Sequence, residues 1–213
     1  MLICITHRVS PGNTSPSIVS TYHPPSSGGY KLIQKAYRDA EWASTGWVHD
    51  GKPYIAHLRM AAIGGIFLKL RSVEQIITAL HHDTLENFAN KLSYAYLEKE
   101  YGTRVAWNVQ FLAREARPET AELIALADAR YADRFRHLSP DRSWLILLKL
   151  VDRLHNMKSY KAFYADSEER FNRKFKETVE VFLPLADTIG YGDTFRFFIQ
   201  QWLGITVPAP RLQ

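Results

Sequence analysis

The chain has 213 residues, 46% of them hydrophobic and 23% charged, a composition that fits one globular domain with a real core rather than two domains. Its single cysteine, Cys4, excludes an internal disulfide and a cysteine-based metal site, which suits a reducing compartment, so we expect a cytoplasmic protein. Lys and Arg number 27 against 22 Asp and Glu, but these cations are spread along amphipathic segments, and we expect no nucleic-acid partner.

The beginning of the chain has the composition of a loose segment. Residues 1–28 are rich in Pro, Gly, Ser and Thr and predict an irregular leader. No apolar run reaches the roughly 18 residues of a membrane span, and the opening residues lack the basic lead of a signal peptide, so we expect no membrane partner. We expect the folded domain to cover residues 29–205 and a short tail to cover residues 206–213.

The rest of the chain has helical periodicity. Apolar residues recur at three- and four-residue spacing, whereas strand-like alternation is scarce. Ser139 and Pro140 stand where a helix would begin, and Gly102 and Gly190 stand where helices would stop. The expected helical segments are 30–43, 55–70, 72–87, 92–101, 104–116, 118–137, 139–157 and 168–190. The sequence therefore predicts an all-α fold, a single bundle of about eight or nine helices.

Four polar residues lie directly beside apolar runs of these helices: His57, His82, Asp83 and Asp152. A buried imidazole or carboxylate needs a hydrogen bond, an ion partner or a metal. Any one of them alone is best explained as a satisfied core residue. Two His and two Asp from three separate helices instead indicate a metal site, with a ligand set suited to Mn²⁺, Fe²⁺, Zn²⁺ or Mg²⁺ and with positions left for water.

Helix geometry predicts what stands beside this metal. Residues four apart share a helix face, so Glu86 is expected one turn beyond His82 and Asn87 one turn beyond Asp83. Asn156 and Ser159 would follow Asp152 along another face and line a substrate. A carboxylate near a metal-bound water could move its proton while the metal offsets phosphoryl charge, which favours phosphoester or pyrophosphate hydrolysis.

Other polar and small residues leave alternatives open. His81 points about 100° away from His82 on a helix and is expected to pack or lie on the surface. His155 could orient a ligand or contact phosphate, and Lys149 and Arg153 could line a polyphosphate cleft or simply be paired. The Gly64–Gly65 pair indicates close helix packing, because no strand precedes it as in a phosphate-binding loop.

Four stretches resemble a known family. They are "GKPYIAH" (51–57), "HDTLEN" (82–87), "LLKLVDRLHNMKS" (147–159) and "FLPLADTIG" (182–190). With them the chain resembles the HD-domain superfamily of metal phosphohydrolases, and within it the RelA/SpoT-type alarmone hydrolases, especially the small stand-alone ones. The resemblance runs from about Tyr30 to Trp202 and implies an all-helical fold.

The resemblance also implies roles for particular residues. His57, His82, Asp83 and Asp152 would bind Mn²⁺. An acidic pair, Glu then Asp, would activate water to remove pyrophosphate from the ribose 3′ position of ppGpp. Asn156 and Ser159, the latter usually Thr in the family, would face the nucleotide.

Two departures from the family pattern affect this reading. The acidic pair of the family is replaced here by Glu86 and Asn87, and the Asn87 amide cannot take a proton. If the missing carboxylate is the essential base, the rate of hydrolysis should fall by a factor on the order of 10² to 10⁴. Val48 and His49 stand where the family places an Arg-Lys pair that contacts guanine. Trp47 or His49 could stack on a purine instead, or could simply pack.

The sequence therefore supports one leading function and two alternatives. The leading hypothesis is a Mn²⁺-dependent 3′-pyrophosphohydrolase of an alarmone nucleotide, of ppGpp or ppApp type, with Glu86 and Asn87 at the catalytic position and His49 among the substrate contacts. One alternative is a binding or sensor protein that lost turnover through Asn87. The other is an HD phosphohydrolase that acts on a different nucleotide.

Overall fold

The computed structural model of the chain describes residues 18–114, 120–163 and 168–208. Residues 1–17 of the predicted leader and 209–213 of the predicted tail lie outside this part. The α-helices are α1 (Gly28–Ala43), α2 (Ile55–Phe67), α3 (Val73–His81), α4 (Thr84–Asn87), α5 (Tyr94–Tyr101), α6 (Thr103–Leu112), α7 (Ala121–Arg136), α8 (Trp144–Phe163), α9 (Glu168–Glu177), α10 (Leu183–Thr188) and α11 (Gly192–Leu203). Short 3₁₀ turns cover Ile18–Thr21 and Pro140–Arg142, and a π-helical turn covers Thr178–Phe182. The predicted all-α fold is confirmed.

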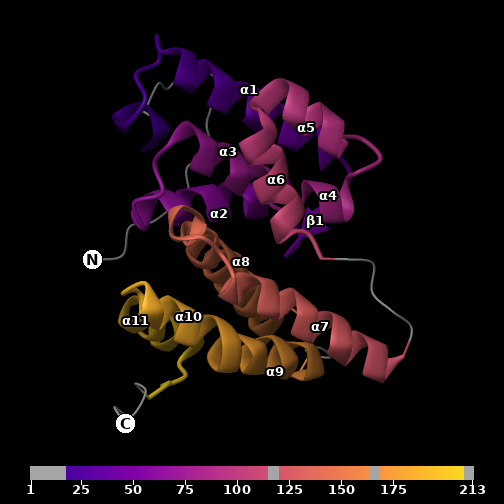
Figure 1. The fold of residues 1–213 in the computed structure, drawn as a ribbon, viewed down its shortest axis with the longest axis vertical. Coiled ribbons are helices and arrows are strands. Elements are labelled where there is room, and N and C mark those ends of the chain that lie inside the picture. Colours follow the sequence, from indigo (N-terminus) through magenta and orange to yellow (C-terminus); the bar gives the residue numbers. More distant parts are fainter. Residues whose placement is uncertain (1–17, 115–119, 164–167, 209–213) are drawn as a thin grey trace.

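Helix α8 runs through the middle of the molecule (Figure 1). Helices α1, α2, α3, α5 and α6 lie on one side of it and α9, α10 and α11 on the other, and α8 packs directly against α2, α9 and α11. Its apolar residues Leu145, Leu148, Leu150 and Met157 have no exposed surface. A helix covered on both sides buries its polar residues as well, so those of α8 need partners inside the protein.

Local signals in the sequence explain where several helices begin and end. The Ser27 hydroxyl accepts a hydrogen bond from the Tyr30 amide at the start of α1. Ser72 and Gln75 form a reciprocal capping box at the start of α3. Gly102, with φ of 90°, ends α5 in a conformation that glycine adopts without strain.

The continuous helix expected over residues 72–87 is interrupted. Helix α3 ends at His81, His82 and Asp83 form a turn, and α4 follows for one turn. The side chain of His81 is completely buried and its Nδ1 lies 3.0 Å from Thr84 Oγ1. Burial lowers the pKa of His81 to about 4, so His81 is a neutral packing residue.

A small antiparallel hairpin precedes α2, which the helical periodicity did not predict. Strands β1 (Val48–His49) and β2 (Lys52–Pro53) pair Val48 with Pro53 and His49 with Lys52. The connecting residues Asp50 and Gly51 have φ of 56° and 67°. Positive φ at both positions is what a tight hairpin turn needs, and the Asp-Gly pair is its sequence signal.

Helices α2 and α8 pack closely at Gly64. A Cβ atom added there would lie 2.5 Å from Val151 Cγ1, so only glycine fits at this distance, as the Gly64–Gly65 pair predicted. Within the described residues, none of the helices combines the length and the apolar character that crossing a membrane requires.

Candidate metal centre

The structure brings together the four side chains that the sequence singled out as metal ligands. His57 comes from the first turns of α2, His82 and Asp83 from the turn between α3 and α4, and Asp152 from the middle of α8. All four are buried, with exposed fractions between 1% and 8%. One ligand atom of each lies within 4.8 Å of the others.

The distances within this cluster suit one metal ion. His57 Nε2 lies 3.3 Å from His82 Nε2, 3.4 Å from Asp83 Oδ2 and 3.3 Å from Asp152 Oδ1. His82 Nε2 lies 3.3 Å from Asp83 Oδ2 and 3.5 Å from Asp152 Oδ1. Neighbouring ligands around one divalent ion have such separations, because bonds from the ion to nitrogen and oxygen are about 2.0–2.2 Å long.

Hydrogen bonding fixes which nitrogen of His82 is free to bind. Its Nδ1 lies 2.8 Å from the carbonyl oxygen of Ala79, which can only accept, so Nδ1 carries the proton. In the neutral ring the lone pair of Nε2 then points toward His57, Asp83 and Asp152. Lone pairs and carboxylates that face one another at these distances need a cation between them, and the donor set therefore fits a divalent metal.

The pKa values of the clustered side chains also indicate that positive charge is favoured between them. Burial opposes charge on His82, yet Asp83 and Asp152 raise its pKa well above the ordinary value. Burial also opposes charge on Asp83 and Asp152, yet the two imidazoles, with Lys149 beside Asp152, hold the pKa of both carboxyls well below the usual range. The two carboxylates are thus ionised, and a metal would supply the charge that protons on the imidazoles otherwise provide.

Polar neighbours hold Asp152 in place. Lys149 Nζ donates to Asp152 Oδ2 at 2.9 Å, and Asn156 Nδ2 donates to Asp152 Oδ1 at 2.6 Å. Lys149 is 5% exposed, and although burial opposes its charge, Asp152 raises its pKa. Asn156, which the sequence predicts to face the nucleotide, donates to a metal-ligand candidate and helps to orient it.

Asn87 reaches the cluster through Tyr54. The Tyr54 hydroxyl donates to Asp83 Oδ2 at 2.6 Å, and Asn87 Nδ2 donates to the Tyr54 oxygen at 3.3 Å. Burial and Asp83 both raise the pKa of Tyr54, so its hydroxyl keeps its proton. The amide at position 87 leaves that single proton to Asp83, whereas a carboxylate there would compete for it.

Glu86 belongs to α4 and His82 to the turn before it, so the spacing of one continuous helix does not relate the two residues. Its Oε2 accepts a hydrogen bond of 2.9 Å from the backbone amide of Arg114, just after α6, and its side chain is exposed. Glu86 therefore lies in the helical turn that follows Asp83, with its side chain accessible to water.

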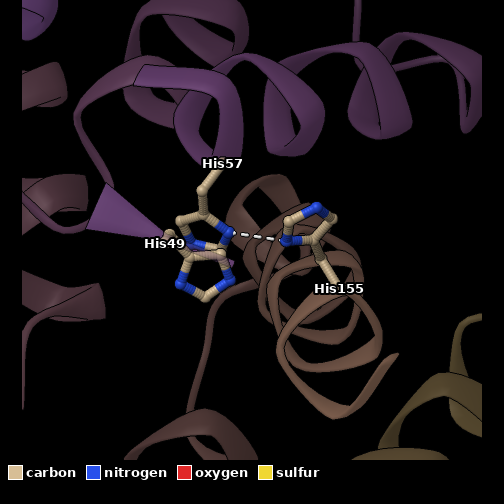
Figure 2. Close-up of side chains that lie close together, drawn as sticks. All are labelled: His49, His57 and His155. Carbon is tan, nitrogen blue, oxygen red and sulfur yellow. Dashed lines mark hydrogen bonds between the residues drawn. The ribbon is translucent and has the colours of Figure 1, made fainter. Parts of the chain in front are cut away.

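His49 and His155 form a second layer beside His57. Figure 2 shows His57 on α2, His155 on α8 and His49 on β1 directed toward one another. His57 Nδ1 lies 2.8 Å from His155 Nδ1, and the His49 ring lies 4.5 Å from the His57 ring and 5.3 Å from the His155 ring. With His57 Nε2 facing the ligand cluster, its Nδ1–H donates to His155, which orients the His57 ring.

Ser159 and the β1–β2 hairpin close this end of the site. The Ser159 hydroxyl lies 3.2 Å from His49 Nε2 and contacts Asp50 Oδ2, and Ser159 is 2% exposed. Of the three substrate contacts predicted from sequence, His49 and Ser159 thus lie together, and Asn156 lies one turn away on Asp152.

Several cations lie near Asp152 and around Glu177. Arg153 is 1% exposed, and its Nη2 lies 2.8 Å from Glu177 Oε1, to which Arg114 Nη2 also donates at 2.7 Å. Lys174 of α9 lies near both arginines and Lys149, and burial together with these cations lowers its pKa to about 8. Lys149, Arg153 and Arg114 are thus each paired with a carboxylate, and Lys174 lies close to them.

Three contributors were missed in the sequence: Tyr54, Asp50 and the ligand-orienting contact of Asn156. Tyr54 and Asp50 lie inside or beside the "GKPYIAH" stretch, and the Asp-Gly pair at 50–51 was the available signal for a turn near His57. The direction of Asn156 carried no such signal, because its position four residues after Asp152 fits a substrate contact and a ligand contact equally well.

Comparison with known proteins agrees with this architecture. A family model described as HD domain matches residues 32–192. The chain is 32% identical over 167 residues to the guanosine-3′,5′-bis(diphosphate) 3′-pyrophosphohydrolase of Aquifex aeolicus (strain VF5), which covers 74% of the chain and 21% of that protein. It is 28% identical over 180 residues to the bifunctional (p)ppGpp synthase/hydrolase SpoT of Escherichia coli (strain K12), covering 81% and 24%. It is 29% identical over 201 residues to a GTP pyrophosphokinase of Myxococcus xanthus, covering 84% and 26%.

The chain belongs to the HD-domain family, and its RelA/SpoT-type relatives confirm the resemblance that the four sequence stretches indicated. It spans about a quarter of the length of the curated relatives that it matches. The Escherichia coli relative is named for both synthesis and hydrolysis of (p)ppGpp, and the Myxococcus xanthus relative for GTP pyrophosphokinase activity. The Aquifex aeolicus relative is named for hydrolysis alone, and the cluster described above is a set of His and Asp side chains that could hold a metal.

Proposed function

We propose that the chain hydrolyses the 3′-pyrophosphate of an alarmone nucleotide of ppGpp or ppApp type, with a Mn²⁺ ion bound by His57, His82, Asp83 and Asp152. The observation that carries the proposal is the buried cluster of these four side chains, whose ligand atoms face one another at 3.3–3.5 Å. The Aquifex aeolicus relative, a guanosine-3′,5′-bis(diphosphate) 3′-pyrophosphohydrolase, supplies the substrate class. A divalent ion held there supplies Lewis acidity to a water molecule and to the scissile phosphoryl group.

The protein's own residues supply positioning and proton transfer. Tyr54, Lys149 and Asn156 hold the two aspartates in the orientation that binding requires. Glu86, an exposed carboxylate three residues after Asp83, would take the proton of the attacking water. Since Asn87 cannot accept a proton, Glu86 carries this role alone.

The charged residues along α8 favour one orientation of the bound nucleotide. Lys149, Arg153, Arg114 and Lys174 lie on one side of Asp152 and attract the pyrophosphate group. His49, Asp50 and Ser159 lie on the other side, where an acid would repel phosphate and where the nucleoside fits better. Lys149 and Ser159 are ten residues apart on one helix, about 15 Å, which is roughly the length of such a nucleotide.

One observation favours a second candidate function. The amide of Asn87 donates to Tyr54 and thereby stabilises the hydrogen bond from Tyr54 to Asp83, so it strengthens the ligand cluster while removing a base. A protein that binds metal and nucleotide but turns over very slowly would have this arrangement. We therefore keep a sensor or binding protein as the alternative.

The test is release of pyrophosphate from ppGpp and ppApp in the presence of Mn²⁺, measured on the chain as it stands and on Asn87→Asp. We expect turnover by the unmodified chain, and a rate higher by about 10² or more in Asn87→Asp if the added carboxylate acts as a second base. Asp193→Asn is the control, because Asp193 lies on α11 with its side chain 95% exposed.

The outcomes separate the candidates. Turnover only in Asn87→Asp, with tight nucleotide binding by the unmodified chain, supports the sensor. No cleavage of either nucleotide by either form contradicts the proposed hydrolysis, and cleavage of another nucleotide under the same conditions would assign the site to a different substrate.

A further inference from the structure

Asp50 occupies an unusual backbone conformation at the tip of the β1–β2 hairpin. Its φ of 56° lies in the left-handed region, which costs conformational energy for any residue other than glycine and least for Asp and Asn. In this conformation the carboxylate oxygen Oδ2 accepts a hydrogen bond from the hydroxyl of Ser159 on α8. The strained turn thus holds one carboxylate against the inner wall of the candidate site.

The second oxygen of Asp50 is buried without a hydrogen-bond donor. Oδ1 has no hydrogen-bond partner among the residues that the structure describes, although the side chain is only 12% exposed. His49 Nε2 is 3.7 Å from Oδ1, within ion-pair distance when the imidazole is protonated but beyond hydrogen-bond distance, and it lies closer to Ser159. A buried carboxylate oxygen without a donor is unfavourable, so a ligand that supplied a donor at this position would be favoured.

The location of Asp50 limits which part of a ligand this can be. It lies at the Ser159 end of α8, with His49 between it and His57, and away from the cations around Lys149 and Arg153. A carboxylate repels phosphate groups, so Asp50 faces the nucleoside part of the substrate. The donors of a nucleoside that differ between the common purines lie on the Watson–Crick edge of the base.

We propose that Asp50 is a specificity-determining residue that selects guanine-type over adenine-type nucleotides. The N1–H and exocyclic amino group of guanine are adjacent donors that both suit a carboxylate. Adenine presents an N1 lone pair at the same place, which would face the carboxylate and leave it unpaired. The inference rests on the proposed function, since it names the base of the same nucleotide substrate. Asp50 would also replace the base contact that is missing because Val48 and His49 stand where the family has an Arg-Lys pair.

The test compares ppGpp with ppApp on the unmodified chain, Asp50→Asn and Asp50→Gly. Preference is measured as kcat/KM, or as Kd where a nucleotide is bound without being cleaved. Asparagine tolerates the left-handed backbone and still accepts from Ser159, but it adds an N–H donor; glycine removes the carboxylate and the strain together. Bound Mn²⁺ is measured in each variant to show that the ligand cluster is intact, and Asp193→Asn repeats the chemical change at an exposed position.

We expect the unmodified chain to prefer ppGpp by about tenfold or more, and both Asp50 variants to lose that preference mainly through weaker use of ppGpp. A preference for ppApp in the unmodified chain, or an unchanged ratio in both variants with Mn²⁺ still bound, would overturn the role of Asp50 and leave the proposed function standing. If the unmodified chain neither cleaves nor binds either nucleotide, the proposed function fails and this inference fails with it.

Discussion

His155 is connected to the candidate metal centre through His57. Its Nδ1 lies 2.8 Å from the Nδ1 of His57, whose other nitrogen faces the three remaining ligand candidates. Removing the acceptor would leave a buried N–H unpaired and free the ring to rotate. We expect His155→Ala to weaken Mn²⁺ affinity by about 10- to 100-fold, whereas His155→Asn, whose side-chain oxygen can still accept, keeps a larger part of it.

The measurement is a direct Mn²⁺ titration, so the result does not depend on turnover. His137→Ala is the matched control, because His137 follows α7 with its side chain 74% exposed. Wild-type affinity in His155→Ala would show that packing alone fixes the His57 ring, and equal losses in His155→Ala and His155→Asn would show that the accepted hydrogen bond is not what matters.

Some residues of the candidate site could be predicted from the sequence and others could not. The four ligand candidates could be predicted because their residue types are costly to bury and stand beside apolar runs. The partners of Asn87 and Asn156 could not, because an amide can donate in several directions and the choice depends on side chains from other elements. Tyr54 contacts Asp83 across 29 residues of sequence, a separation that helical periodicity does not address.

At the scale of elements, the close packing of α2 on α8 sets the distance between His57 and Asp152. A Cβ atom at Gly64 would meet Val151 Cγ1 at 2.5 Å, whereas one at Gly65 would meet Leu70 at an ordinary 3.5 Å. We expect Gly64→Ala to lower the free energy of unfolding by about 1–3 kcal/mol because the helices must move apart. Gly65→Ala should be neutral or raise it by up to about 1 kcal/mol, since alanine favours the helix.

Urea unfolding of the two variants checks this prediction, and their Mn²⁺ affinities show whether the helix spacing reaches the metal centre. The neighbouring glycines form a matched pair, since they share a helix and a substitution. Equal stability of Gly64→Ala and Gly65→Ala would mean that Val151 moves aside without cost.

The elements differ in how well the sequence predicts them. Long amphipathic helices such as α1 and α8 follow from periodicity and caps. The break between α3 and α4 does not, because the pattern of apolar residues continues across His82 and Asp83 while the backbone turns there. Two-residue strands are likewise too short to show alternation, and only the Asp50–Gly51 turn indicates the hairpin.

In the whole molecule, the candidate ligands come from two different groups of helices. His57, His82 and Asp83 belong to the layer formed by α1 to α6, and Asp152 belongs to α8, against which α9 and α11 pack (Figure 1). In the unfolded chain, 69 residues separate Asp83 from Asp152, so the same ligands are far from one another on average. A metal that needs all four therefore binds the folded state almost exclusively and stabilises it as a whole.

This linkage predicts a thermal shift. At a free Mn²⁺ concentration 100 times its dissociation constant, the folded state should gain about 2.7 kcal/mol, which raises Tm by several degrees in a domain of this size, and EDTA should reverse the shift. His82→Ala removes one ligand from the cluster and should abolish most of the response, while His137→Ala should keep it. An equal shift in His82→Ala would place the stabilising ion elsewhere in the protein, and no shift in the unmodified chain would contradict the four-ligand site, because an ion bound by these four side chains has no comparable site in the unfolded state.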